Sequence, residues 1–266
     1  MMPVLMAKQK NSSQSRPAGI GAGEGYLDRT HRPLQCLIFL TPLLLFYQIG
    51  SSVHPWNPGQ GRPPNVIAFL LMLRFFAFFG AMGGYLPLLA VIAVLLIWHL
   101  SRKDPWTIDP VLYVGMLAES ILWALPLLLL ASLITTGPAV SNPAVAQAGS
   151  VLPWQTQAVL SVGAGIYEEL LFRLILITLL NILLVDMLGL SAGKAIPLII
   201  ITSAVLFSLY HYLGHETPAW NTFFFRTAAG IYFAAVFIFR GFGVDVGTHA
   251  AYDLILVFLQ YSTHHG

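Results

Sequence analysis

Charged side chains are scarce in this chain. Lys, Arg, Asp and Glu make up 9% of the 266 residues, and the formal net charge is only +2. A soluble domain carries roughly 25% charged residues, because its surface must face water. Apolar residues reach 57% here, so we expect most of the surface to face lipid. The net charge is too small to indicate a nucleic-acid partner.

Cysteine and polar stretches are also rare. The single cysteine, Cys36, excludes an internal disulfide and any multi-cysteine metal site. Residues 1–32 are rich in Gly, Ser, Gln, Lys and Arg, and we predict that they form a disordered tail. The rest of the chain divides into N-terminal transmembrane helices at 33–150 and a C-terminal transmembrane region at 151–266.

Long apolar runs dominate what remains. A membrane-spanning helix needs about 20 mostly apolar residues. Eight segments meet this need, at approximately 33–50, 64–82, 84–101, 110–135, 155–186, 194–213, 221–240 and 244–262. Their apolar residues are continuous rather than alternating, which favours helices over the strands of a barrel. We therefore predict an all-α, multi-pass integral membrane bundle of about eight transmembrane helices, in the cell membrane if the protein is bacterial.

The basic residues do not agree on one orientation. Positive residues favour the cytoplasmic side. The tail carries Lys8, Lys10, Arg16, Arg29 and Arg32. With eight crossings, the loops on the opposite side carry Arg62, Arg102, Lys103, Lys194 and Arg240. Either the rule fails here or one segment does not cross, and the segment at 64–82, which Arg74 interrupts, is the candidate.

Ionisable residues also lie inside the apolar segments, where they are costly and usually face a protein interior or a water-filled cavity. The set is Arg74, Glu119, Glu168, Glu169, Arg173, His211, Arg226, His249 and Asp253. Most of these come after residue 155, which predicts a functional site in the last four segments. For Glu119 we expect either a place in the cavity wall or an ion pair with Arg226 or Arg74.

The segment at 155–186 carries two adjacent glutamates. Residues four apart share one face of a helix, so Glu169 can pair with Arg173. Glu168 lies about 100° around the helix from Glu169, and it has no local partner. A buried glutamate without a partner is suited to act as a general base or acid. The alternative is a structural contact in which Glu168 binds another arginine.

Two later segments each place an imidazole at helical spacing from a second residue. Phe207 and His211 are four residues apart, and so are His249 and Asp253. Asp253 could orient His249, or both could stabilise an oxyanion if Asp253 keeps its proton. The alternative is a hydrogen bond that only joins helices. Together with Glu168, these groups predict hydrolysis of an amide by an activated water inside the membrane.

The three spacings also resemble the motifs of a known family. Glu-Glu-x-x-x-Arg at 168–173, Phe-x-x-x-His at 207–211 and His-x-x-x-Asp at 249–253 are similar to the three motifs of the CPBP family, in the same order. This family of CAAX proteases and bacteriocin-processing enzymes includes the type II CAAX prenyl endopeptidases. The resemblance covers about residues 155–260.

The resemblance implies a helical bundle around a water-accessible cavity and a membrane-associated peptide or protein as substrate, possible classes being prenylated and leader-bearing chains. It also implies that Glu168, helped by His211, activates the water, and that His249 and Asp253 form the oxyanion site. The prenyl endopeptidases have Asn at the position of Asp253, whereas bacterial members have either residue. The supporting residues would be Glu169, Arg173 and Phe207.

Other readings of the same residues stay open. Glu168, His211, His249 and Asp253 are also a plausible zinc ligand set with room for a water, although we favour the metal-free enzyme. A transporter or an immunity-type binding protein could use the same polar cavity without catalysis. The inverted repeats typical of many transporters are not found in the sequence.

Overall fold

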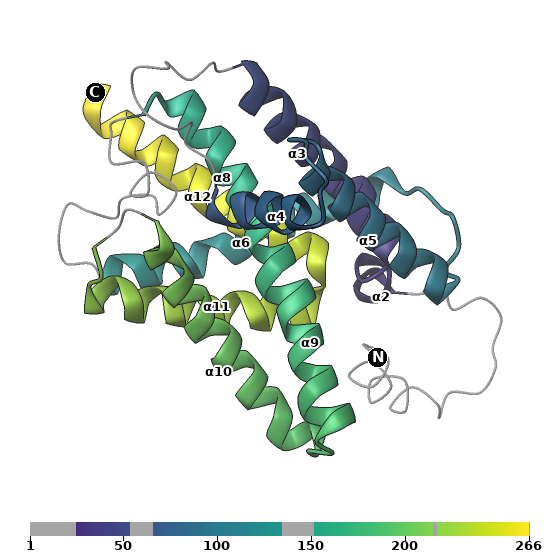
Figure 1. Ribbon diagram of the computed structural model, residues 1–266. Helices are drawn as coiled ribbons and strands as arrows, with labels where there is room; N and C mark the ends of the chain where they lie inside the picture. The colour runs from purple at the N-terminus through teal and green to yellow at the C-terminus, as the bar shows by residue number, and fades with distance from the viewer. Residues whose placement is uncertain (1–24, 54–65, 135–151, 215–216, 266) are drawn as a thin grey trace.

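The computed structural model describes residues 25–53, 66–134, 152–214 and 217–265. Within these ranges the chain is helical with no strand, which confirms the predicted all-α class (Figure 1). In chain order the elements are α2 (Tyr26–Thr30), α3 (Pro33–Val53), α4 (Ile67–Phe78), α5 (Leu86–Arg102), α6 (Pro110–Ile134), α8 (Trp154–Glu169), η2 (Leu170–Leu176), α9 (Ile177–Asn181), η3 (Ile182–Met187), α10 (Ala192–Tyr210), η4 (His211–Leu213), α11 (Trp220–Arg240) and α12 (Phe242–His265).

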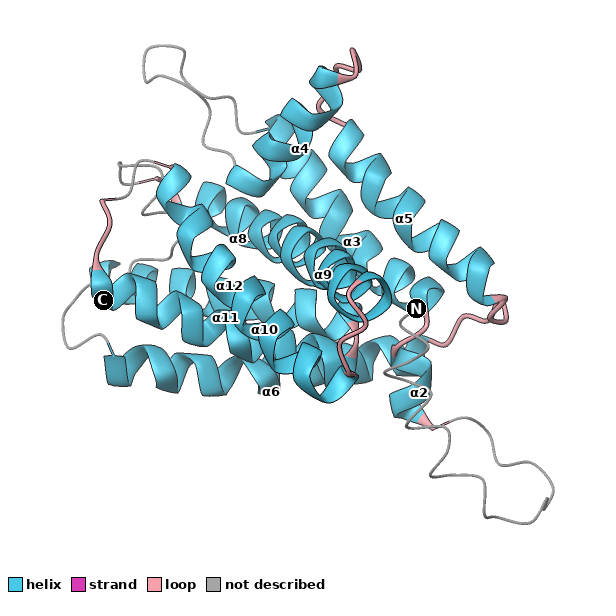
Figure 2. Cartoon of the chain, turned by 60° about the horizontal axis from the view of Figure 1, so that its bottom comes forward, coloured by secondary structure: helices cyan, strands magenta, loops and turns pink. Residues whose placement is uncertain are grey.

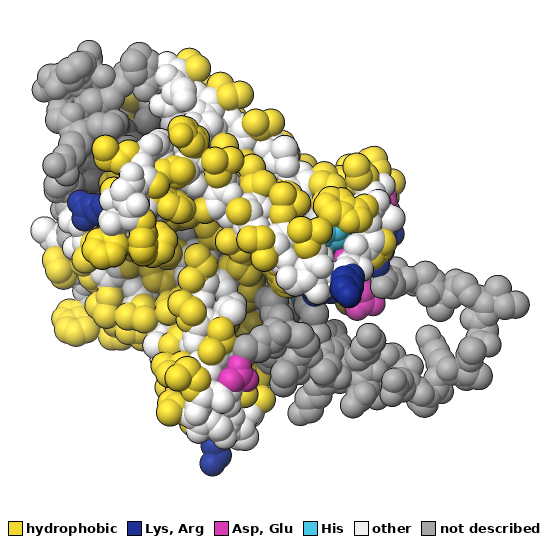
Figure 3. Space-filling view, turned by 45° about the vertical axis from the view of Figure 1, so that its right-hand side comes forward, with side chains coloured by type: hydrophobic (Ala, Val, Ile, Leu, Met, Phe, Trp, Pro, Cys, Tyr) yellow, Lys and Arg dark blue, Asp and Glu magenta, His cyan; other side chains and the backbone are white. Residues whose placement is uncertain are grey.

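Six helical segments of the described chain are long and apolar enough to cross a membrane. They are α3, α6, the continuous run from α8 to η3, α10, α11 and α12. The outer face in Figure 3 is mostly hydrophobic and carries few charged side chains, as contact with lipid requires. The chain is therefore a multi-pass membrane protein, as predicted, but the expected count of eight spanning helices is not confirmed.

The two remaining apolar segments form shorter helices that lie together at one edge of the bundle (Figure 2). Helix α4 has 12 residues, which corresponds to about 18 Å at 1.5 Å per residue. This is well below the hydrocarbon thickness of roughly 30 Å. Helix α4 contains Arg74 and belongs to the apolar segment at 64–82, which the sequence analysis names as the candidate that does not cross. The helix is too short to span the membrane.

The folded part begins earlier than the sequence predicts. Residues 25–32 were assigned to a disordered tail, but they include α2. The Tyr26 hydroxyl donates a hydrogen bond of 2.8 Å to Glu119 Oε2 on α6, and Arg29 pairs with Asp109. Burial, together with the Glu119 carboxylate, raises the pKa of Tyr26 to about 12, which keeps the phenol proton in this bond. Composition alone did not reveal these partners, and residues 1–24 lie outside the described ranges.

Helix α12 is the central helix, since 72% of the apolar 18-residue stretch in its membrane-spanning part, Phe242–Ser262, is buried inside the protein. It packs along α8, and the two helices approach closely at Gly165. A Cβ on Gly165 would lie 2.9 Å from the Ala250 backbone nitrogen and 3.0 Å from the Val246 carbonyl oxygen, so any larger residue would separate the helices. One helical turn beyond this contact, α8 carries Glu168 and Glu169 beside His249.

The helix that begins as α8 changes its geometry directly after Glu169. Residues 170–176 form the π-helical segment η2, in which the backbone bonds run over five residues rather than four. Such wide turns are rare inside helices and frequently occur at functional sites. The apolar pattern runs through this segment unchanged, so the change of geometry cannot be predicted from it.

Candidate active site

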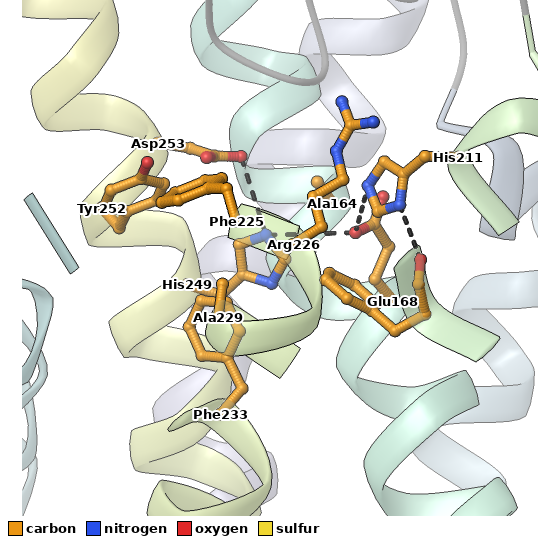
Figure 4. Close-up of a pocket in the computed structure, with 11 residues that line it drawn as sticks. Ala164, Glu168, His211, Phe225, Arg226, Ala229, Phe233, His249, Tyr252 and Asp253 are labelled. Carbon is orange, nitrogen blue, oxygen red and sulfur yellow. Dashed lines mark hydrogen bonds and ion pairs between the residues drawn. The ribbon is translucent and has the colours of Figure 1, made fainter. Parts of the chain in front are cut away.

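The predicted catalytic residues meet in one buried cavity between α8, α10, α11 and α12 (Figure 4). Glu168, His211, His249 and Asp253 all line it, and none is more than 5% exposed. The cavity volume open to the centres of water molecules is about 20 Å³, and about 10–15 Å³ is enough for one water. Residues far apart in the sequence therefore surround a space of the size that a reacting water needs.

The two glutamates of α8 have different partners. Glu169 Oε2 lies 2.9 Å from Arg173 Nε, as the spacing predicted. Glu168 instead points into the cavity, where its Oε2 lies 3.7 Å from His211 Nε2 and 4.0 Å from His249 Nε2. Among the described residues its carboxylate contacts Tyr210, His211 and His249 and no arginine, which does not support the alternative of an arginine pair.

The hydrogen bond of His211 shows which of its two ring nitrogens carries hydrogen. Its Nδ1 lies 2.7 Å from the carbonyl oxygen of Phe207, which can only accept, so Nδ1 carries hydrogen. In the neutral ring Nε2 then presents a lone pair to the cavity. The 3.7 Å to Glu168 Oε2 is too long for a direct hydrogen bond, but a water between the two acceptors can donate to both.

Phe207 supports the site with its ring as well as its carbonyl group. The ring lies edge-on to His211, with 4.8 Å between centroids. The guanidinium carbon of Arg173 lies 4.3 Å from the centre of the same ring. A cation over an aromatic face is attracted by the ring's electrons, so Phe207 connects the Glu169–Arg173 pair with His211.

His249 forms its hydrogen bond with Glu169, which the sequence analysis paired only with Arg173. Its Nδ1 lies 2.6 Å from Glu169 Oε1, whereas its Nε2 lies 3.8 Å from Asp253 Oδ2. Glu169 therefore makes the hydrogen bond that orients this ring, and Asp253 lies within ion-pair distance of its other nitrogen. The ring also stacks on Phe233, with 4.5 Å between centroids and 18° between planes.

Glu119 lies outside this cavity and has a different partner from either one predicted. It pairs with Arg240 at the end of α11, with 2.7 Å between Arg240 Nη2 and Glu119 Oε2. Trp123 Nε1 donates a further bond of 3.0 Å to Oε1. The expected pairs with Arg226 or Arg74 are not found among the described residues, because Glu119 lies at the level of the last residue of α11, whereas Arg226 belongs to its second turn. Arg226 lines the cavity instead.

The zinc alternative finds no ligand set here. In the part of the chain that the structure describes, no group of three or more His, Cys, Asp and Glu side chains is arranged to hold a metal ion. Both histidines use Nδ1 in hydrogen bonds, so Nε2 is the ring nitrogen that each presents to the cavity. The metal-free enzyme therefore stays a prediction, and the reaction below uses the side chains alone.

Sequence reasoning missed Tyr210. Its hydroxyl donates a hydrogen bond of 3.0 Å to Glu168 Oε1 and accepts one of 2.9 Å from the backbone N–H of Ala68. Glu168 and Tyr210 lie on different helices, and Tyr210 occupies an unspecified position of the Phe-x-x-x-His spacing. No periodicity within one segment could have found this contact.

Comparison with protein-family models finds a match for the C-terminal region. Residues 150–255 match the model of the Rce1-like type II CAAX prenyl endopeptidases. This region belongs to the Rce1-like family. It contains all three motifs and every residue of the Glu168 cavity, and the match supports a membrane protease of the CAAX type at the level of the family. No curated protein and no solved structure matches the chain.

Proposed function

We propose that the chain is an intramembrane endopeptidase whose reacting water is activated by Glu168 and His211. The observation that carries this proposal is the facing pair itself. Glu168 Oε2 and His211 Nε2 are 3.7 Å apart, both are buried, and both open onto a cavity that can hold a water. A water that donates to both atoms keeps its lone pairs directed away from them, toward a substrate carbonyl.

The reaction follows from these positions. Glu168 Oε2 takes one proton from the water while the water oxygen forms a bond to the carbonyl carbon of the scissile peptide. The carbonyl oxygen becomes an oxyanion. Glu168 then returns the proton to the amide nitrogen, the C–N bond breaks, and an acid and an amine are released. His211 holds the water through Nε2 and needs no change of charge.

His249 is placed to stabilise the oxyanion. Glu169 holds Nδ1, so Nε2 faces the cavity between Glu168 and Asp253. With hydrogen on both ring nitrogens, Nε2 donates to the oxyanion, and the Glu169 carboxylate offsets the positive charge. Donors fixed before the reaction begins are usually the largest single contribution to such catalysis. Asp253 adds a second donor when it is protonated.

The substrate is proposed to be a membrane-anchored peptide or protein. The rest of the cavity wall is mainly apolar and aromatic, with Ala164, Phe225, Ala229 and Phe233 beside the reacting groups. These side chains offer contacts to aliphatic substrate residues, and Arg226 is the one arginine in the same wall. The name of the matched family, CAAX prenyl endopeptidase, suggests a prenylated C-terminal tail as the first substrate to test.

The test uses the full chain, purified in detergent, and a farnesylated peptide ending in a CAAX sequence with a fluorophore and a quencher on opposite sides of the cleavage site. We expect cleavage by the wild type, and a loss of roughly 10²–10⁴-fold in Glu168→Gln and His211→Ala, as for removal of a general base. Both variants should remain folded and abundant in the membrane.

The same experiment separates the alternatives. Cleavage that is unchanged in Glu168→Gln would refute the assigned mechanism. If neither this peptide nor membrane-anchored leader peptides are cleaved by the folded wild type, the cavity serves a binding or transport function instead.

A further inference from the structure

Tyr210 joins three helices at the cavity. It is the last residue of α10, is 5% exposed, and contacts Glu168 on α8 and Ala68 on α4 through one hydroxyl group. The hydroxyl donates its hydrogen to Glu168 Oε1, since the Ala68 N–H must itself be a donor. Neither Tyr210 nor Ala68 belongs to any of the three motifs.

We propose that Tyr210 is a positioning residue that fixes the carboxylate of Glu168 for catalysis, and that the first turn of α4 strengthens its hydrogen bond. This inference rests on the proposed function, because it assumes that Glu168 takes a proton from water. It adds a contribution from α4, which lies outside the matched region at 150–255.

The two oxygens of Glu168 have separate surroundings. Oε1 accepts the hydrogen bond from Tyr210, at 3.0 Å, whereas Oε2 faces the two imidazoles of His211 and His249. The terminal torsion of a glutamate is broad, so a carboxylate without a fixed partner turns easily. Because Tyr210 holds Oε1, Oε2 stays directed at the position of the water.

The start of α4 explains why the tyrosine hydroxyl is a good donor. Ala68 is the second residue of this helix, and N–H groups in the first turn have no partner within the helix. They also lie at the positive end of the helix dipole. A hydroxyl that accepts from such a group becomes polarised and donates more strongly through its own hydrogen. Ala68 is fully buried, so water does not replace the bond.

The ring of Tyr210 is held independently of its hydroxyl. It packs edge-on against Phe172 and His211, with 4.9 Å and 4.8 Å between centroids. Phenylalanine can make the same ring contacts. Tyr210→Phe therefore removes the two hydrogen bonds and leaves the packing in place.

The first test measures kcat and KM of Tyr210→Phe with the farnesylated CAAX peptide. Loss of a hydrogen bond to a charged group corresponds to a fall in kcat of roughly 10- to 100-fold, and KM should stay within about twofold of the wild type. The matched control is Tyr167→Phe, which removes the hydroxyl of a fully buried tyrosine that precedes Glu168 in the chain and packs against Tyr47 and Phe69; this hydroxyl has no hydrogen-bond partner among the described residues. It should retain wild-type kcat.

A wild-type kcat in Tyr210→Phe would overturn the proposal, and so would an equal fall in Tyr167→Phe. A change confined to KM would assign Tyr210 to substrate binding and would also overturn it. These results differ from failure of the proposed function, in which the wild type and Glu168→Gln would be indistinguishable.

The second test removes the hydrogen bond from the Ala68 N–H to the Tyr210 hydroxyl and does not alter the tyrosine. Ala68→Pro deletes the N–H at a first-turn position where no intrahelical bond is lost. Its control is Ile67→Pro, one residue earlier, which keeps the Ala68 N–H and suits the extended backbone of Val66. We expect Ala68→Pro to lower kcat more than Ile67→Pro does, and to cause no further fall when combined with Tyr210→Phe. Equal effects of the two proline variants, or an additional loss in the double variant, would contradict the role given to α4.

Discussion

Glu169 Oε1 lies 2.6 Å from His249 Nδ1, while the other oxygen of the same carboxylate lies 2.9 Å from Arg173 Nε. One buried carboxylate thus joins a permanent cation to a ring that faces the reacting groups. Glu169, which the sequence analysis named only as a supporting residue, fixes the direction of His249. Its partner Arg173 is fully buried, and this carboxylate is its ion-pair partner.

Glu169→Gln should both destabilise the protein and lower its activity. Breaking a buried ion pair on one side leaves an uncompensated charge, which costs about 3–5 kcal/mol. Glu168→Gln removes a charge with no ion-paired arginine and should leave stability near that of the wild type. Thermal unfolding of both variants in the same detergent measures the difference. Equal melting temperatures would show that Arg173 has a second counter-charge.

The sequence predicted contacts within one helix and failed for those between helices. The Glu169–Arg173 pair follows from a spacing of four residues, and so does the Phe207–His211 contact. The bond from Glu169 to His249 depends on how α8 and α12 are rotated about their axes. That rotation depends on packing at positions such as Gly165, which carry no chemical signal of their own.

The length of helix α4 could also not be predicted from the sequence. The apolar run at 64–82 is long enough to span, yet α4 ends at Phe78. The chain then turns at Gly80, which has a φ of +79° and so adopts a left-handed conformation that favours glycine. Composition records the run of apolar residues but not the turn inside it. The glutamate at 119 was likewise recognised as buried charge, while its partner at the end of α11 could not be chosen from spacing.

Asp253→Asn should retain most of the activity, because Glu169 rather than Asp253 orients His249. The amide keeps the shape of the side chain and supplies an N–H donor toward the cavity, where Asp253 Oδ1 has no hydrogen-bond partner among the described residues. We expect kcat within about tenfold of the wild type, a change of less than about 1.4 kcal/mol in activation free energy. Asp253→Ala, which offers no donor, should fall further. Equal, complete loss in both variants would indicate that the carboxylate itself is required.

Removal of metal should leave the activity unchanged. The four cavity residues do not form a metal-binding group in the described structure, and structural or catalytic zinc normally has three or four protein ligands at about 2.0–2.3 Å. The measurement is the zinc content of the purified chain by mass spectrometry, followed by peptide cleavage after treatment with a strong chelator. One tightly bound zinc per chain, together with loss of cleavage on chelation and its recovery on adding zinc, would replace the metal-free mechanism.

The contact between α8 and α12 can be tested at Gly165. In Gly165→Val the new side chain would meet the backbone of Ala250 and Val246, and such overpacking costs about 1–3 kcal/mol. The contact sets the distance between Glu169 and His249. The activation free energy should therefore change by more than the free energy of unfolding does. The matched control is Gly193→Val on α10, where a Cβ would meet no atom within 4 Å. Melting temperature and kcat of the two variants are compared with the wild type. If Gly165→Val kept the wild-type kcat, the close approach of the helices would not be what places His249 in the site.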